Sequence, residues 1–269
     1  MDGKLNQLQS LLPAGVLVDA AWLKDRGYYS SLVAKYVRSG WLEQPTRGAY
    51  RRAGATPGED NDAWASVILS LQHLRPPLPL LGGRTALELL GYGHYLSPTG
   101  PRELHLYGRD PPPLWARRLL GPRLVFHYAR LFSNGAVVGP TARLERDSEH
   151  IRRPDRQGVM GLLSISTAEQ ALLELLDEVP QAASFQEADT LIEGLSTLSP
   201  RRMSHLLASC RSVKTKRLAL WFADRHRLPW AARLDRQNID LGTGNRVLVA
   251  GGRLDPTYKI TVPREMAAP

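Results

Sequence analysis

Apolar residues recur at helical spacing between Ser30 and Gly40, and short runs typical of strands follow them. A shorter helix should precede this one, because Asp19 is a suitable N-cap and Gly27 is a natural stop. After Gly40, strand-like residues at 41–42 and 49–52 flank a turn at 45–48. The order of helix, turn, helix and hairpin predicts a winged helix-turn-helix.

The second of these helices should have an apolar face that packs inward and a polar face that meets solvent. Leu32, Val33, Tyr36 and Val37 share the apolar face, whereas Ser31, Lys35 and Arg38 share the polar one. We expect the polar face to enter a DNA major groove, and Arg47 to reach the duplex from the tip of the hairpin. The predicted DNA-binding residues are Ser30, which should cap the helix, Ser31, Lys35, Arg38, Arg47, Arg51 and Arg52. Similar helical pairs also serve as packing or protein-contact modules, so the pattern alone leaves that alternative open.

The rest of the chain predicts a second domain in which strands come first, helices follow, and a strand pair closes the fold. Residues 52–61 carry glycine and proline without periodicity, which indicates a linker. We therefore expect a DNA-binding domain at 1–55 and a mixed α/β domain at 56–269, giving an α+β protein overall. Its predicted helices are 64–74, 85–90 (capped by Thr85), 114–120, and four that follow Thr167, Ser184, Ser199 and Ser212; its predicted strands are 78–81, 103–107, 124–128, 160–165, 246–249 and 258–262.

Charge supports a nucleic-acid partner. The 269 residues carry a formal net charge of +9, with 35 Lys and Arg against 26 Asp and Glu. The stretch from Asp19 to Arg52 holds seven basic and three acidic residues, so the excess is concentrated in the predicted DNA-binding module. A protein of this charge commonly binds a polyanion, and nucleic acid is the commonest polyanion in a cell.

A second basic segment lies in the predicted helical layer. Residues 157–200 contain seven acidic residues and no Lys or Arg, whereas residues 201–233 contain nine basic residues and one acidic residue. The segment can form a second phosphate-contacting surface, or its side chains can pair with the acidic helices. The residues of the possible second surface are Arg201, Arg202, Arg211, Lys214, Lys216 and Arg217.

The sequence offers little for catalysis. Gly82-Gly83-Arg84-Thr85 follows a strand and opens a helix, as a phosphate cradle does, but the next strand carries no pair of carboxylates for a metal ion. His105 and His127 lie on strand patterns and fit half-exposed sheet residues better than metal ligands. Cys210, the single cysteine, fits a buried thiol. We therefore expect no enzymatic activity, no metal and no cofactor.

The same features suggest a bacterial cytoplasmic protein. The first residues lack the apolar core of a signal peptide, and no run approaches the roughly 20 apolar residues of a membrane span. A single cysteine cannot form an internal disulfide, which suits a reducing compartment. Arg greatly outnumbers Lys. Ala, Gly and Pro are also frequent, and this composition is typical of GC-rich bacterial genomes.

Several stretches in this order resemble the AbiEi-type antitoxins, the transcriptional regulators of the AbiE type IV toxin–antitoxin systems. The resemblance spans nearly the whole chain and rests on the order of its motifs more than on any one of them. The matching stretches are 29–42, 47–50, 82–91, 165–174, 216–217, 239–242 and 258–263.

The resemblance implies a function for each domain. Members of this family bind inverted repeats in their own promoter through a winged helix, repress the operon, and counteract a toxin of the nucleotidyltransferase type, with which they are thought to form no stable complex. We therefore expect a DNA-binding antitoxin that acts as a monomer in solution or assembles on DNA. The alternative is a protein-binding antitoxin that sequesters its toxin through the second domain. A third reading, a nuclease or nucleotidyltransferase, lacks the carboxylate pair.

Overall fold

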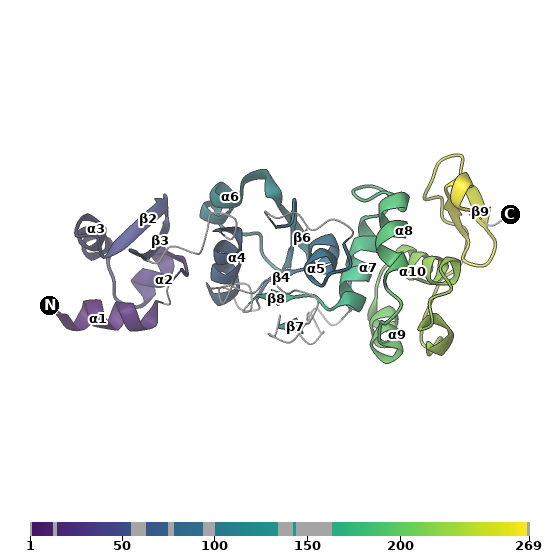
Figure 1. Cartoon of the computed structure of the whole chain (residues 1–269), viewed down its shortest axis with the longest axis horizontal. Coiled ribbons are helices and arrows are strands. Elements are labelled where there is room, and N and C mark those ends of the chain that lie inside the picture. The colour runs from purple at the N-terminus through teal and green to yellow at the C-terminus, as the bar shows by residue number, and fades with distance from the viewer. Residues whose placement is uncertain are drawn as a thin grey trace. The chain divides into compact units, whose positions relative to one another are not determined.

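A computed structural model describes residues 2–12, 15–54, 63–74, 78–93, 100–133, 142–143 and 163–267 (Figure 1). The expected domain boundary at 55/56, most of the expected linker, and residues 160–162 of an expected strand lie outside these ranges. The chain divides into two compact units. The first comprises 1–80, 97–128 and 142–165, and the second comprises 81–96, 129–141 and 166–269.

The N-terminal part of the first unit has the expected order of helix, turn, helix and hairpin, drawn in purple and blue in Figure 1. Three of its strands form one sheet in the order β1-β3-β2, in which β3 pairs antiparallel with both neighbours. The elements are α1 (Asp2–Leu11), β1 (Val18–Asp19), α2 (Ala20–Asp25), α3 (Ser30–Arg38), β2 (Leu42–Thr46) and β3 (Ala49–Arg52).

Local sequence explains where these helices begin and what they bury. The Asp19 carboxylate accepts a hydrogen bond from the Trp22 amide at 2.8 Å, which confirms the expected N-cap of α2. Gly27 follows with φ 81°, a left-handed conformation that suits glycine. The apolar face of α3 packs into a core that also contains Leu8 of α1 and Leu12, which follows that helix.

The start of α3 and the presence of α1 differ from expectation. Helix α3 begins at Ser30 and its N-cap position is Tyr29, whose side chain makes no capping hydrogen bond, so Ser30 lies one residue inside the helix. It ends at Arg38 rather than Gly40. Helix α1 was not expected, because its segment is largely polar, yet Leu5, Leu8 and Leu12 recur at helical spacing and pack against the core.

The remainder of the first unit supplies most of a five-stranded sheet in the order β6-β5-β4-β8-β7. Strands β5 and β6 pair in parallel, and every residue of β5 is buried, as in a sheet covered on both faces. The elements are α4 (Ala63–Leu74), β4 (Leu80–Leu81), β5 (Leu104–Gly108), α6 (Leu114–Leu120), η2 (Gly121–Arg123), β6 (Leu124–Tyr128), β7 (Ala142–Arg143) and β8 (Ser164–Ile165).

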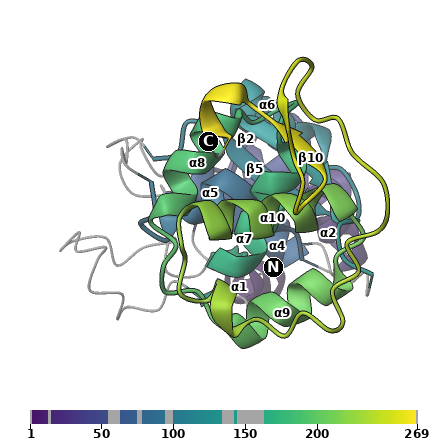
Figure 2. The same ribbon diagram turned by 90° about the vertical axis from the view of Figure 1, so that its right-hand side faces the viewer.

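The second unit is mainly helical, which confirms the helical layer. Figure 2 shows α10 lying across α7, with β10 beside it. Thr167, Ser184, Ser199 and Ser212 each accept a hydrogen bond from a backbone amide three residues later, so each of these four helices begins at a side-chain cap. The elements are α5 (Gly83–Leu89), α7 (Ala168–Glu178), α8 (Phe185–Glu193), α9 (Pro200–Ser209), α10 (Val213–Arg225), η4 (Ala231–Arg233), β9 (Arg253–Asp255), β10 (Ile260–Val262) and η5 (Arg264–Met266).

Two predictions in this unit were wrong. The expected strand at 246–249 makes only one isolated bridge, between Arg246 and Ile260, and the partner of β10 is β9. The amides of Leu248 and Val249 donate to the Thr261 hydroxyl instead of to a neighbouring strand. Helix α5 begins at Gly83 after an N-cap at Gly82, so Thr85 lies within the helix.

Candidate nucleic-acid interface

Helix α3 presents the predicted polar face to solvent. Ser30, Ser31, Lys35 and Arg38 are exposed, whereas Val33 and Tyr36 on the opposite face are 5% and 7% exposed. The helix is therefore fixed by its apolar side, and its polar side stays available to a ligand. Within the described residues, Arg38 has no hydrogen-bond or ion-pair partner.

The hairpin that follows α3 carries the second predicted group of cations. Arg47 is exposed in the turn between β2 and β3, next to Gly48 with φ 88°. Arg51 is half-buried and its Nε lies 2.8 Å from Glu43 Oε2. This guanidinium holds the pKa of Glu43 below its usual value. Arg52 donates from Nη1 to the backbone oxygen of Gln9 at 3.4 Å, so Arg51 and Arg52 both have intramolecular partners.

Two exposed aromatic side chains at the ends of α3 escaped the sequence analysis. Tyr29 is 63% exposed at the N-cap, and Trp41 is 49% exposed just after the helix. The sequence placed Trp41 in the hairpin, but β2 begins at Leu42. An exposed aromatic residue beside an exposed cationic helix can contact sugars or base edges, so both belong to the candidate interface.

The possible second basic surface does not form one continuous face. Lys216 and Arg217 are 5% and 1% exposed, so neither contributes to a surface in this fold. Arg217 donates to the backbone oxygens of Leu241, Gly244 and Lys259 at 2.8–3.0 Å and thereby holds the C-terminal segment. The ammonium of Lys214 donates to two backbone oxygens at the end of α7. These lysine and arginine side chains serve as internal hydrogen-bond donors.

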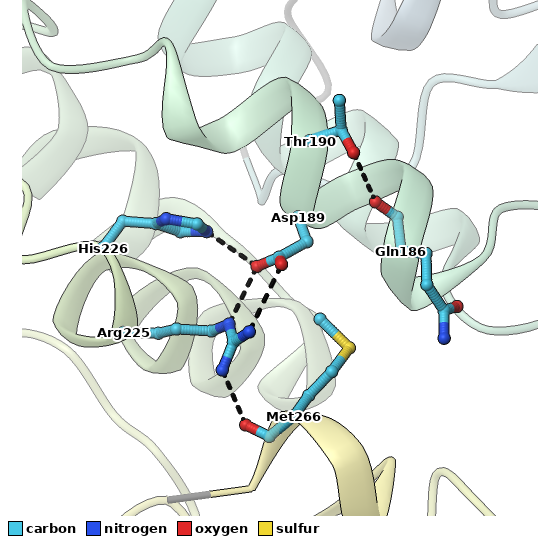
Figure 3. Close-up of polar contacts among 6 residues, drawn as sticks. All are labelled: Gln186, Asp189, Thr190, Arg225, His226 and Met266. Carbon is cyan, nitrogen blue, oxygen red and sulfur yellow. Dashed lines mark hydrogen bonds and ion pairs between the residues drawn. The ribbon is translucent and has the colours of Figure 1, made fainter.

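Other cations of the segment pair with the acidic helices, as the alternative interpretation allowed. Arg202 Nη1 lies 2.9 Å from Glu169 Oε2. Figure 3 shows Asp189 on α8 between two side chains of the α10 end, with Arg225 Nε at 2.9 Å and His226 Nε2 at 2.7 Å. Arg225 also donates to the Met266 backbone oxygen at 2.8 Å, which ties the C-terminal segment to α10. Of the predicted set, Arg201, Arg202 and Arg211 are exposed, and Arg211 donates to the Ser133 backbone oxygen.

The glycine turn before α5 has an anion of its own. Gly83, with φ 51°, donates its amide to Glu174 Oε2 at 2.9 Å. The other oxygen, Oε1, accepts from Gln170 Nε2 at 2.8 Å and from the Ser166 hydroxyl at 3.1 Å. Burial raises the pKa of Glu174 to about 7, against the lowering effect of these three donors. The carboxyl group therefore occupies the place that a phosphate would take in a nucleotide-binding turn.

The single cysteine and His105 are packed inside the fold, whereas His127 is half-buried, as expected. Cys210 ends α9 and is 4% exposed, and burial raises the pKa of its thiol to about 11, as expected for an unreactive thiol. His105 is 3% exposed rather than half-exposed, because β5 is buried on both faces. Its Nδ1 lies 3.0 Å from Nε2 of His127, whose ring also stacks on Tyr107.

Among the helices of the described residues, none has the length and apolar character needed to cross a lipid bilayer.

Comparisons with known proteins identify the family. Residues 103–263 match the family described as "Transcriptional regulator, AbiEi antitoxin, Type IV TA system", and residues 1–98 match the N-terminal domain of AbiEi antitoxin transcriptional regulators. A search of curated proteins finds no match. The crystal structure of the RV2827C protein from Mycobacterium tuberculosis aligns with a TM-score of 0.56 at 17% identity, over 96% of this chain and 89% of that one, which shows a shared fold. The two family matches together cover nearly the whole chain, and the chain therefore belongs to the AbiEi antitoxin family of type IV toxin–antitoxin transcriptional regulators.

Proposed function

We propose that this antitoxin represses its own toxin–antitoxin operon by binding repeats in the promoter through the winged helix at its N-terminus. The observation that carries the proposal is the exposed polar face of α3, on which Ser31, Lys35 and Arg38 lie together. Arg38 or Lys35 reads guanine edges in the major groove, and each good bidentate contact discriminates by about 1–3 kcal/mol. Such a regulator acts where the chromosome is, in the bacterial cytoplasm.

The hairpin supplies contacts that are less selective for sequence. Arg47 reaches a minor groove or a phosphate from the tip, whereas Arg51 and Arg52 position the DNA backbone. Tyr29 and Trp41 add contacts at the two ends of the recognition helix. The exposed cations Arg201 and Arg211 supply, at most, a few additional phosphate contacts from the second unit.

The experiment is a binding titration of the full chain with a labelled duplex from the region upstream of its gene. We expect the upstream duplex to bind about a thousandfold more tightly than a scrambled duplex of equal length, measured by fluorescence anisotropy at fixed salt. A footprint would then place the protected bases on inverted repeats. Equal affinity for both duplexes would contradict promoter recognition.

The antitoxic activity is proposed to counter a toxin of the nucleotidyltransferase type encoded in the same operon, without a stable complex and without catalysis by the antitoxin. The Glu174 carboxyl group in the glycine turn supports a non-catalytic chain, because it fills the position of a bound phosphate. Co-expression with the neighbouring gene should restore growth, while the two proteins elute separately from a sizing column. Co-elution would favour the sequestering antitoxin instead.

A further inference from the structure

A cavity of about 180 Å³ lies within the first unit, where the hairpin of the winged helix meets α4 and α6. Pro45 of β2 and Arg51 of β3 line it on the hairpin side. Trp64, Ser66 and Val67 of α4 line it on the other side. Its remaining lining residues are Leu17, Ala63, Leu119, Leu120 and Arg123.

Two buried polar groups at this cavity are left without partners. Trp64 and Ser66 are 3% and 1% exposed, and in the described part of the chain neither the Trp64 Nε1 nor the Ser66 hydroxyl has a hydrogen-bond partner. Gly100, with φ 82°, lies against the indole nitrogen, where a Cβ would come within 2.8 Å of it. Both polar atoms are fully buried, so a ligand in the cavity takes its hydrogen bonds from other groups of the wall.

The size and the walls of the cavity indicate the chemistry of that ligand. An apolar cavity of about 150 Å³ is large enough to hold benzene, so this one accepts a single ring with a small substituent. Leu17, Val67 and Leu120 offer an apolar wall for the ring. Arg51 donates to Glu43 and Arg123 donates to the Pro101 backbone oxygen. A guanidinium has five N–H donors, so both side chains keep donors for a carboxylate.

We propose that this cavity binds a small aromatic carboxylate and that its occupancy changes the affinity of the antitoxin for DNA. The ring packs against the leucine and valine side chains, and the carboxylate accepts hydrogen bonds from Arg51 and Arg123. The ligand contacts the hairpin and α4 at the same time, so it stabilises one particular distance between these two elements. Any DNA complex that needs another separation is then weakened, by linkage. This coupling rests on the proposed promoter binding, whereas the binding site itself does not.

The binding step is tested on the ¹⁵N-labelled full chain, with benzoate as the probe. The indole N–H signal of Trp64, assigned with the Trp64→Phe variant, should shift saturably as benzoate is added up to about 10 mM. The Trp230 indole donates to the Leu195 backbone oxygen at 2.9 Å and should not move. Benzyl alcohol, which keeps the ring and lacks the carboxylate, should bind about tenfold more weakly.

Two substitutions on α6 separate a specific site from a nonspecific effect. Leu119 lines the cavity and is 36% exposed, so Leu119→Trp should fill it and abolish the shift without unfolding the core. Leu114 is 60% exposed on the same helix and outside the lining, so Leu114→Trp should bind benzoate as the natural chain does. An unmoved Trp64 signal, or a shift that persists in Leu119→Trp, overturns the proposal.

The coupling is tested by repeating the titration with upstream duplex at saturating benzoate, where we expect a loss of affinity of about tenfold. The same loss should be absent in Leu119→Trp. If the indole signal shifts but no duplex is bound selectively, the promoter function fails and the site stands. If the upstream duplex binds selectively and its affinity is the same with and without benzoate, the proposed coupling is overturned.

Discussion

Arg51 and Glu43 face each other across the β2–β3 hairpin, as direct neighbours in its register and with Nε and Oε2 2.8 Å apart. The pair sets how much of the Arg51 charge is available to an external ligand. Glu43 also accepts a hydrogen bond from the Gly54 amide at 3.2 Å, so its carboxylate orders the end of the hairpin as well.

We expect Glu43→Gln to raise the affinity for upstream and unrelated duplexes by the same factor, because the released Arg51 contacts phosphate rather than bases. The slope of log K against log salt should steepen by about one, and stability should change by less than about 1 kcal/mol because the pair is half-exposed. Asp25→Asn removes an exposed charge from the same module and is the control. An identical change in Asp25→Asn would show that net charge, rather than Arg51, is responsible.

Arg38 should carry sequence selectivity. Arg38→Ala is expected to bring the affinity for the upstream duplex close to that for random DNA, a loss of about 1–3 kcal/mol per base contact. Arg38→Lys keeps the charge and loses the planar fork, so it should retain the salt dependence while losing most of the selectivity. Anisotropy titrations on both duplexes make the comparison. An equal loss on both duplexes in Arg38→Ala would assign Arg38 to phosphate contact.

We expect Arg217 to stabilise the fold and to make no contribution to DNA affinity. Its side chain is buried and donates to three backbone oxygens, of which Lys259 O also accepts from the Arg246 amide. Arg217→Met therefore leaves the Leu241 and Gly244 oxygens without this donor and should lower the free energy of unfolding by at least about 2 kcal/mol. Arg233→Met, at an exposed cation of the same segment, should change it by less than about 0.5 kcal/mol. Urea denaturation measures both. A stable Arg217→Met protein with a reduced salt slope for DNA would reverse this assignment.

Glu174 should make stability depend on pH. Burial raises its pKa from 4.5 to about 7, so the folded chain binds more protons than the unfolded chain between these pH values. Stability contributed by this group is therefore present below pH 4.5 and falls as pH rises toward 7, by at most about 3 kcal/mol. Glu174→Gln should remove this slope, so its stability relative to the natural chain should improve between pH 5 and 7.5.

Denaturation curves of the two proteins at several pH values test this point. Glu193→Gln changes an exposed carboxylate on α8 and should follow the natural chain at every pH. Parallel profiles for Glu174→Gln and the natural protein would mean that Glu174 does not titrate in this range.

The parts of this fold that were predictable are those specified by neighbouring residues. Asp19, Thr167 and Ser184 each cap a helix within three residues of themselves, and such local pairs can be recognised in a sequence. The two faces of α3 follow from its period for the same reason.

The parts that were missed depend on partners far along the chain. Arg217 resembled a surface cation because nothing near it in sequence indicates the backbone oxygens, 24 to 42 residues away, that hold it. The strand expected at 246–249 failed because the Thr261 hydroxyl binds its amides in place of a ladder. The sequence did not predict the cavity for the same reason, because Pro45, Trp64 and Leu119 come together only in the folded chain.

The contact between Gly83 and Glu174 satisfies the first amide of α5 from within the chain. The acceptor of this glycine turn is thus a carboxyl group that lies 91 residues further along the sequence. Substituting that one acid by a small neutral residue would reopen the turn, and inorganic phosphate would then compete for the Gly83 amide.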